Sequence, residues 1–402
     1  MTWDEKVDSS LRIHASIVLI AEFQLSEVHI FAPIPAIRKR TRLVKICAFF
    51  QAQGLRILYF GWMRDRSEEA FAREATQGVT NRIILQGGGY GGSRTRLYYP
   101  LWMLAVFCQA LRLPKGGTWY CLGFESAFPA LIVSKWKRAK LIFDDADRFS
   151  MIVRLPRPLQ KLLVSAERWA SRHADVHIVP GYSRYEWHGA NMRLLRNSPT
   201  MQQFLTAQEI SAGFDTGTNS QGFTIYVNGW VGETRGAPVF LAAMKQLASQ
   251  RPDAKLLVIG RGDKGAFGEL ITLSNVEYHT EVPQETALAY YYASDLVLTY
   301  YDPAIDINRH AESNKWGDCA FCGVPFVVNS EVETASSFVA AGAAFAVPYH
   351  DIEGLVELVT HCMDNPQQLR QSQAALTGFR HEFPPFDSAL AEIMASILPP
   401  LS

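Results

Sequence analysis

The sequence predicts an α/β protein made of two doubly wound domains that face a central cleft. Short apolar runs alternate with helical segments along both halves of the chain, which is typical of buried parallel strands. The chain has 402 residues, and 48% of them are hydrophobic, which is enough for two cores of ordinary domain size. A polar stretch rich in Gly, Ser and Thr interrupts the alternation at 206–222, and the same rhythm restarts after it.

The first half contains the expected strands of one parallel sheet. A helix is expected near 42–53, because Gly54 follows it and glycine commonly ends helices. We assign 1–205 to this domain and expect the C-terminal helix at 380–402 to join it. The expected strands are 28–32, 55–60, 119–122, 139–143 and 176–180.

The second half repeats the pattern. After the expected linker at 206–222, a second domain is predicted at 223–379, with a helix at 238–249. Ligands of such sheets bind beyond the carboxyl ends of the strands, so we expect the two domains to share a cleft there. The expected strands are 223–227, 254–259, 296–300 and 324–328.

Composition predicts a reduced, cytoplasmic protein. The six cysteines are scattered through apolar surroundings, and the Cys319–Cys322 pair has no second pair to complete a metal site. The longest early apolar run, 16–21, is too short to span a membrane. We expect no signal peptide, and an added strand or helix before the first core strand.

The net charge of zero hides an asymmetry. Residues 1–200 hold 29 basic and 16 acidic side chains, whereas residues 201–402 hold 10 basic and 23 acidic ones. The basic residues cluster at 38–45, 135–140 and 154–172. Each cluster alone fits a solvated helix face, but all three in one half favour peripheral contact with an anionic membrane.

Polar side chains gather where an expected helix begins near residue 314. Glu312, Ser313, Asn314, Lys315 and Asp318 combine a cation, hydroxyl and amide donors and two carboxylates. Backbone N–H groups at a helix start favour anions, so this segment suits a phosphate on one side and a ribose on the other.

A glycine-rich turn follows the first strand of the second domain. Gly229 lets the backbone approach a ligand, Trp230 lies beside it, and Arg235 can pair with phosphate oxygens. An ordinary strand-to-helix turn with a surface arginine is the alternative.

The segment 260–265 matches a GxGxxG pattern after a strand. Gly260 and Gly262 suit either a dinucleotide site or a tight turn facing the cleft. The pattern follows the second strand of its domain, and no acidic residue ends the next strand cleanly, so we favour the turn.

Carboxylates follow two strands of the first domain. Asp144, Asp145 and Asp147 end one strand, and Glu125 lies after the neighbouring one. Each could cap a helix, and one could serve as a general base toward a hydroxyl in the cleft. We favour Asp147 as the base, because it lies farthest into the loop.

Together these segments resemble GT-B glycosyltransferases of family 4 (glycosyl transferases group 1), mainly over 223–375. The turn at 228–236 is similar to the family's Gly…Lys/Arg-Gly phosphate loop, and 313–325 resembles its PNK…E…GxP block. Segments 124–126 and 145–147 are similar to inverting members of bacterial exopolysaccharide assembly. The Glu-x7-Glu of retaining members corresponds to His310 and Asp318 here, so both stereochemical outcomes stay open.

The resemblance implies sugar transfer from a UDP- or GDP-sugar to a glycan or polyprenyl-diphosphate-linked acceptor. The setting would be assembly of a bacterial surface polysaccharide, in the cytoplasm at the inner face of the plasma membrane. No metal, other cofactor or nucleic acid is expected. The alternatives are a non-catalytic sugar-nucleotide or glycan-binding protein and an NAD(P)-dependent oxidoreductase.

The resemblance also assigns roles. Asp147 would be the base, and Arg235 and Lys315 would neutralise the departing diphosphate, with Asp318 on the ribose. The remaining expected donor-site residues are Gly229, Trp230, Gly260, Gly262, Tyr300, Ser313 and Asn314. The expected acceptor-side residues are Arg38, Arg40, Glu125, Asp145 and Asp147.

Overall fold

A computed structural model of the protein describes residues 27–73, 77–90, 92–153, 155–214, 222–280 and 282–397. The expectations for residues 1–26, part of the basic cluster at 154–172 and the linker residues 215–221 therefore lie wholly or partly outside the described residues. Within the described ranges, no helix is long and apolar enough to cross a membrane.

The first domain is built on a parallel sheet whose order, over the described residues, is β3-β2-β1-β4-β5-β6-β7. The first described strand, β1, lies in the centre of the sheet; from it the chain winds outward to β3 and returns to pair β4 with β1. The carboxyl ends of β1 and β4 therefore flank the point where the winding reverses. The strands are β1 Glu27–Ala32, β2 Arg56–Met63, β3 Val79–Gln86, β4 Thr118–Leu122, β5 Lys140–Asp144, β6 Val176–Val179 and β7 Met192–Leu194.

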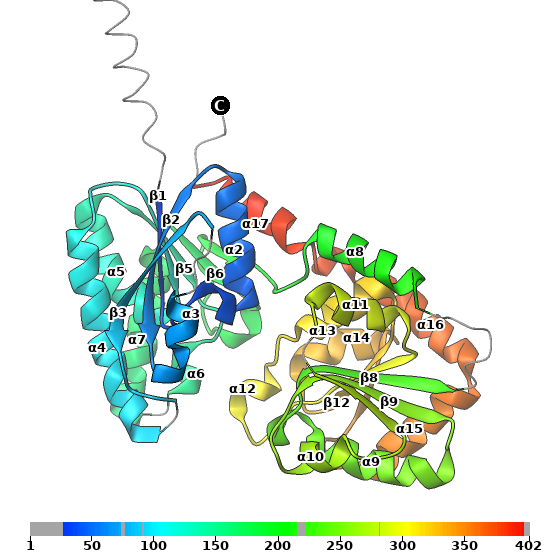
Figure 1. The fold of residues 1–402 in the computed structure, drawn as a ribbon. Helices are drawn as coiled ribbons and strands as arrows, with labels where there is room; N and C mark the ends of the chain where they lie inside the picture. The colour runs from blue at the N-terminus through cyan, green and yellow to red at the C-terminus, as the bar shows by residue number, and fades with distance from the viewer. Residues whose placement is uncertain are drawn as a thin grey trace, which may run out of the picture.

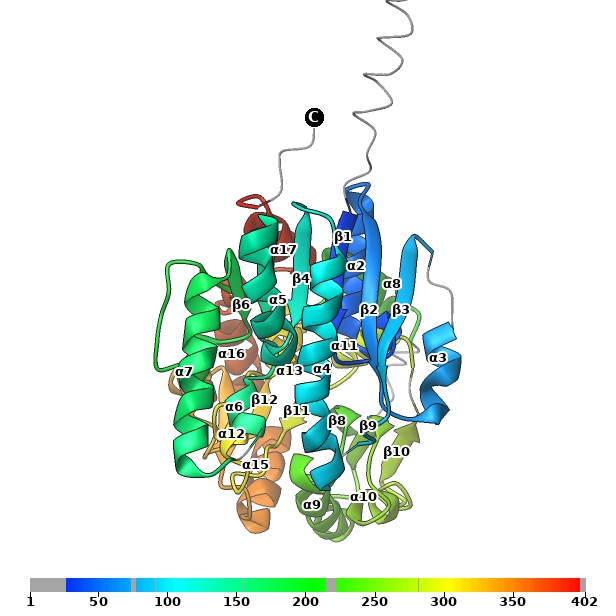
Figure 2. The same ribbon diagram turned by 90° about the vertical axis from the view of Figure 1, so that its left-hand side faces the viewer.

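Helices cover both faces of this sheet (Figures 1 and 2). Helices α4 (Gly92–Arg112), α5 (Phe124–Lys137) and α7 (Arg157–His173) pack on one face around buried Trp102 and Leu131. Helix α2 (Thr41–Ala52) packs on the other face beside α17 (Phe386–Met394). The C-terminal segment thus completes the core of the first domain. The short helices are α3 Glu69–Arg73 and α6 Phe149–Ile152.

The second domain repeats this plan with the order β10-β9-β8-β11-β12-β13 in its described part. Its winding reverses between β8 and β11, which pair in parallel. The two-domain α/β fold expected from the sequence is confirmed. The strands are β8 Phe223–Trp230, β9 Ala254–Arg261, β10 Val276–His279, β11 Leu296–Thr299, β12 Phe326–Asn329 and β13 Ala344–Val347.

The helices of the second domain form two layers around its sheet. One core includes α9, α10 and α15, and the other includes α8, α11, α13 and α14, while α16 contributes to both. Their bounds are α8 Met201–Ala212, α9 Ala237–Gln250, α10 Ala266–Leu270, α11 Gln284–Tyr292, α12 Asp306–Arg309, α13 Asn314–Cys322, α14 Ser336–Ala340, α15 Ile352–Asp364 and α16 Pro366–Thr377.

The boundary between the domains lies earlier than the sequence suggested. Residues 201–212, partly assigned to the linker at 206–222, form helix α8. Thr200 and Gln203 make a capping box at its start, and Phe204 and Ala207 pack into the core of the second domain. The chain therefore crosses between the domains before Thr200, because burial of this apolar face holds α8 against the second sheet.

Candidate functional site

Two adjoining cavities lie where the carboxyl ends of the two sheets face each other. One, of about 440 Å³, lies mainly against the first domain, and the other, of about 450 Å³, lies mainly against the second. Because they share wall residues, they form one cleft. After the roles that the sequence predicts for the two domains, we call the cavity against the first domain the acceptor-side cavity and the one against the second domain the donor-side cavity. The shared wall residues are Asp147, Ile152, Arg184, Glu312 and Asn314.

Arg235 lines the donor-side cavity from the turn after β8. Its Nη1 donates a hydrogen bond to Oδ1 of Asn308 at 3.1 Å, and its guanidinium carbon lies 4.6 Å from the centre of the Tyr301 ring. These two contacts hold the planar guanidinium at the cavity wall. A guanidinium held in this way is suited to bidentate recognition of a phosphate.

Lys315 reaches the same cavity from the first turn of α13. A Cβ placed on Gly229, whose φ is +84°, would lie 3.8 Å from the Lys315 Nζ, so the end of β8 passes next to the ammonium group. Lys315 and Arg235 thus bring two cations to one cavity, beside the N-terminus of α13. That combination suits a ligand with two neighbouring phosphates.

Four other expected donor-site residues also line this cavity. Trp230 is exposed at its edge, and the buried hydroxyl of Tyr300 has no hydrogen-bond partner among the described residues. Ser313 accepts a hydrogen bond from the Tyr301 hydroxyl at 2.6 Å. Asn314 is exposed where the two cavities meet.

Gly260 and Gly262 line neither cavity, contrary to the expectation for the donor site. A Cβ on Gly260 would lie 2.0 Å from the carbonyl oxygen of Gly229, and one on Gly262 would lie 2.2 Å from the oxygen of Val231. Both glycines are therefore required for close packing of backbone at the ends of β8 and β9. The GxGxxG pattern reflects this packing.

Asp318 also lies behind the cavity wall rather than in it, so the structure does not place it on a ribose. It is buried in α13, where its Oδ2 accepts a long hydrogen bond of 3.4 Å from the Tyr291 hydroxyl and its Oδ1 has no partner among the described groups. Burial raises the pKa of Asp318 to about 7, although the nearby charges of Lys45 and Lys315 act in the opposite direction.

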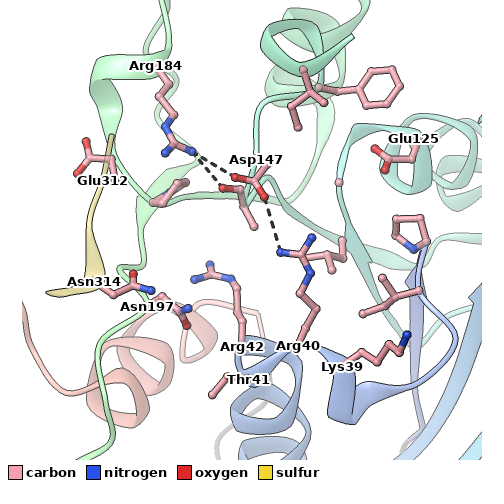
Figure 3. Close-up of a pocket in the computed structure, with 18 of the residues that line it drawn as sticks. Lys39, Arg40, Thr41, Arg42, Glu125, Asp147, Arg184, Asn197, Glu312 and Asn314 are labelled. Atoms are coloured by element: carbon pink, nitrogen blue, oxygen red, sulfur yellow. Dashed lines mark hydrogen bonds and ion pairs between the residues drawn. The ribbon is translucent and has the colours of Figure 1, made fainter. Parts of the chain in front are cut away.

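Asp147 lies at the junction of the two cavities, between two guanidinium groups (Figure 3). Its Oδ2 is 3.7 Å from Nη1 of Arg40, and its Oδ1 is 3.8 Å from Nη1 of Arg184. The carboxylate is about half exposed, with a relative side-chain exposure of 47%. Asp147 is thus open to a ligand, and the two cations fix where it lies.

Glu125 is a second carboxyl group in the wall of the acceptor-side cavity. It begins α5, directly after β4, and is only 7% exposed. Burial, with a smaller contribution from the negative charge of Asp145, raises the pKa of Glu125 to about 7, although the charges of Arg64 and Arg40 act in the opposite direction. A carboxyl group that titrates near neutral pH in a cavity is suited to proton transfer.

Two residues expected on the acceptor side do not line the cavity. Asp145 is buried, accepts a hydrogen bond from the Tyr185 hydroxyl at 2.7 Å, and lies 3.8 Å from His177. Its carboxylate is part of an internal network that joins β5 to the following strand. Arg38 is exposed outside the cavity, while its neighbour Arg40 lines it.

Arg42 belongs to the basic cluster at 38–45 that was expected to contact an anionic membrane, but the structure buries it. Its Nε and Nη2 donate to the two oxygens of buried Asp144 at 2.7 and 2.8 Å, and Tyr120 donates to the same carboxylate. Arg42 also lines the acceptor-side cavity, so its guanidinium, held by buried Asp144, forms part of the cavity wall.

Glu312 was expected only as part of the polar helix start, and Arg184 was given no role, but both join the domains across the cleft. Glu312 pairs with Arg196 at 2.8 Å and accepts a hydrogen bond from Ser183 at 3.0 Å. Arg184 donates through Nε to the carbonyl oxygen of His310 at 3.2 Å. The one signal in the sequence was that Glu312 lies beside the polar helix start. Its partner Arg196 could not be predicted, because it is more than a hundred residues away in the sequence.

His310, which the sequence resemblance aligned with the first glutamate of the Glu-x7-Glu pattern, does not line either cavity. Its Nδ1 is 3.7 Å from an oxygen of Glu333, and its backbone carbonyl contacts Arg184. The imidazole is therefore placed beside a carboxylate of its own domain and away from the two cavities.

Comparisons with known proteins agree with this architecture. A family model described as glycosyl transferase-like matches residues 238–383. A sequence search of curated proteins found no match. The N-terminal domain of trehalose-6-phosphate phosphatase from Candida albicans is similar in structure, with a TM-score of 0.66 and 12% identity over 94% of this chain and 98% of that one.

Two further solved structures show the same likeness. HepE of Anabaena in complex with UDP-glucose has a TM-score of 0.60 and 13% identity, over 92% of this chain and 99% of that one. WaaG, a glycosyltransferase involved in lipopolysaccharide biosynthesis, has a TM-score of 0.58 and 12% identity, again over 92% and 99%. At such identities the likeness establishes the fold.

Proposed function

We propose that the protein is a nucleotide-sugar-dependent glycosyltransferase. It has the GT-B glycosyltransferase fold, and its residues 238–383 match the glycosyl transferase-like family. The donor is a UDP- or GDP-sugar, and it binds in the donor-side cavity. The observation that supports this most directly is the pair of cations, Arg235 and Lys315, in one cavity at the β8/β11 switch point.

The two cations define what the site does for catalysis. When the glycosidic bond to the nucleotide breaks, negative charge develops on the leaving diphosphate. Arg235 and Lys315, with the N-terminus of α13, stabilise that charge because they are already in place before the reaction. We therefore propose transfer without a bound metal, and added EDTA should leave turnover unchanged.

The acceptor-side cavity binds the acceptor. Its lining has more cationic than anionic side chains, which favours an acceptor that carries a phosphate or carboxylate. A polyprenyl-diphosphate-linked glycan of bacterial surface polysaccharide assembly meets this requirement. The lining cations are Lys39, Arg40, Arg42, Arg64 and Arg184, and the lining carboxylates are Glu125, Asp147 and Glu312.

Two carboxyl groups are candidates for the base that accepts the proton of the acceptor hydroxyl. Asp147 is exposed at the junction of the cavities, as expected of the base assigned from the sequence. Glu125 is the second candidate, because a base works best when its pKa is near the working pH.

A non-catalytic nucleotide-sugar-binding protein is the competing function. The observation that favours it is that His310 and Asp318, which replace the two glutamates of retaining relatives, both lie outside the cavity walls. The oxidoreductase alternative rested on the glycine pattern at 260–265, and the packing of Gly260 and Gly262 explains that pattern.

A donor panel tests the proposal. The full-length protein is incubated with UDP- and GDP-sugars and a lipid-linked acceptor extract, and release of nucleotide is measured. Lys315→Ala should weaken binding of the free nucleotide diphosphate, and Asp147→Asn should lower kcat more than donor affinity. Lys255→Ala, which removes an exposed cation of the same domain, is the matched control. Nucleotide binding with no turnover of any donor would support the non-catalytic alternative.

A further inference from the structure

The outer face of the first domain carries an unusual number of exposed apolar side chains. Figure 2 shows α7, α5 and α4 standing side by side on this face, and α5 packs against both neighbours. On α4 the exposed leucines recur at positions 97, 101, 104 and 111, a spacing that places them along one side of the helix. Leu97 is 72% exposed.

The other two helices extend this apolar surface. Trp136 on α5 is 65% exposed, and Leu162 on α7 is 66% exposed. Ile132 on α5 and Leu159 on α7 are also exposed. We call the outer surface of α4, α5 and α7 the helical face. Apolar groups spread over three adjacent helices exceed the scattered single residues of an ordinary soluble surface.

The charges on the helical face have one sign. The three helices contain two carboxylates, Glu125 and Glu167, and both are buried. Their basic residues are exposed apart from Lys137, which is half-buried. Cations that flank apolar side chains, without intervening anions, are complementary to an anionic lipid surface. The basic residues of the three helices are Arg94, Arg96, Arg112, Lys135, Lys137, Arg157, Lys161, Arg168 and Arg172.

The second domain lacks such a surface. Among its described residues, the large apolar side chains that are exposed are Met201 and Leu205, both on α8, and Trp230, which lines the donor-side cavity. The second half of the chain also carries the excess of acidic side chains. An anionic surface would therefore attract the first domain and repel the second, which orients the molecule.

The helical face is continuous with the acceptor-side cavity. Tyr99 of α4 and Glu125 near the start of α5 line that cavity. Because residues two apart on a helix point to different sides, Tyr99 faces the cavity while its neighbours Leu97 and Leu101 face outward on the same helix. Ile152 of α6, which is exposed, lines both cavities just before α7 begins. A lipid held at the helical face therefore has its headgroup close to the entrance of the cavity.

We propose that the helical face docks on an anionic bilayer and presents the acceptor-side cavity to a membrane-borne acceptor with an anionic headgroup. The docking itself follows from the exposed surface, whereas the acceptor rests on the proposed function. The apolar side chains of α4 enter the acyl boundary, and the flanking arginines and lysines bind lipid phosphates.

Vesicle sedimentation tests the docking. The full-length protein is mixed with vesicles of phosphatidylglycerol and phosphatidylethanolamine, and in parallel with phosphatidylcholine vesicles. Binding is expected for the anionic vesicles and should fall with added salt. The double variant Arg157→Gln/Lys161→Gln should bind more weakly, by roughly fivefold for each cation removed. Leu101→Ser/Leu104→Ser should lose roughly tenfold or more, because two apolar groups no longer enter the bilayer.

Matched controls lie outside the helical face. Leu205→Ser removes an exposed leucine of α8, and Lys255→Gln/Arg370→Gln removes two exposed cations of the second domain. Both should bind as the wild type does. Absence of wild-type binding to anionic vesicles, or equal losses in variants and controls, would overturn the proposal. A third outcome would also overturn it: Leu101→Ser/Leu104→Ser binds vesicles as the wild type does, but light scattering shows a different molecular mass from the wild type. The helical face would then join copies of the chain.

Failure of this inference and failure of the proposed function give different results. Nucleotide binding and turnover of a water-soluble acceptor are measured on the same variants, and both should be unchanged. Vesicle binding without turnover of any donor would refute the enzyme and keep the docking face. Turnover without vesicle binding would refute the docking face and keep the enzyme.

Discussion

Replacing Glu125 by glutamine should change how stability and activity depend on pH. Glutamine has the shape of the protonated glutamic acid but cannot ionise. In the folded protein, burial raises the pKa of Glu125 from the ordinary 4.5 to about 7. The substitution therefore removes a group that is costly to ionise in the native state, while the cavity wall keeps its shape.

The sign and size of the effect follow from proton binding. Between pH 4.5 and about 7 the folded state holds the Glu125 proton and the unfolded state has lost it, so stability falls as the pH rises through this range. At ~1.4 kcal/mol per pH unit, the total loss is on the order of 3 kcal/mol. Glu125→Gln should therefore be more stable than the wild type at pH 8, and equal to it near pH 4.

Two measurements check this prediction. Urea denaturation at a series of pH values gives the difference in unfolding free energy between variant and wild type. The pH profile of kcat/KM gives the catalytic part: if Glu125 is the base, wild-type activity rises with pH through about 7 and the variant loses both the rise and most of its turnover.

Asp318→Asn is the matched control, because burial also raises the pKa of Asp318 to about 7 but this residue lines neither cavity. Asp318→Asn should likewise remove part of the fall in unfolding free energy with rising pH, and it should leave the pH profile of kcat/KM unchanged. Superimposable wild-type and Glu125→Gln curves in both experiments would refute the reasoning. If Glu125→Gln changes the unfolding free energy but not the pH profile of kcat/KM, Asp147 is the better candidate for the base.

Three further predictions concern packing and the cleft. Arg42→Met leaves its buried carboxylate partner unpaired, and urea denaturation should show a loss of about 3–5 kcal/mol. Gly260→Ala should cost roughly 3 kcal/mol or more, because the added methyl group meets the backbone of the adjacent strand; Gly268→Ala, where a Cβ meets nothing within 4 Å, should cost nothing measurable in the same assay. Glu312→Gln weakens the pair with Arg196 across the cleft, so small-angle scattering should give a larger radius of gyration, and an unchanged radius would show that other contacts hold the domains.

The fold and the donor-side cations were predictable because they depend on local patterns. Apolar runs of strand length, separated by helical segments, predict parallel sheets, and residues after different strands of such a sheet meet at one edge. Arg235 and Lys315 therefore reach one cavity even though eighty residues separate them. The boundary at 206–222 was misplaced, since α8 is held by contacts with the second core that a polar composition does not reveal.

The wrong assignments of site residues have a common physical cause. Asp145 and Asp147 are two residues apart with the same chemistry, but Tyr185 and His177 enclose the first, while the second opens to the cleft between Arg40 and Arg184. Burial and pairing depend on side chains that the fold brings from distant positions.

The sequence alone determined the apolar runs, the glycine turns and the charge asymmetry, because each of these is a property of neighbouring residues. The pKa of Glu125, the contact of Glu312 with Arg196 and the one-signed helical face depend on distant contacts. They arise because folding decides which charges leave water and which groups then lie beside them.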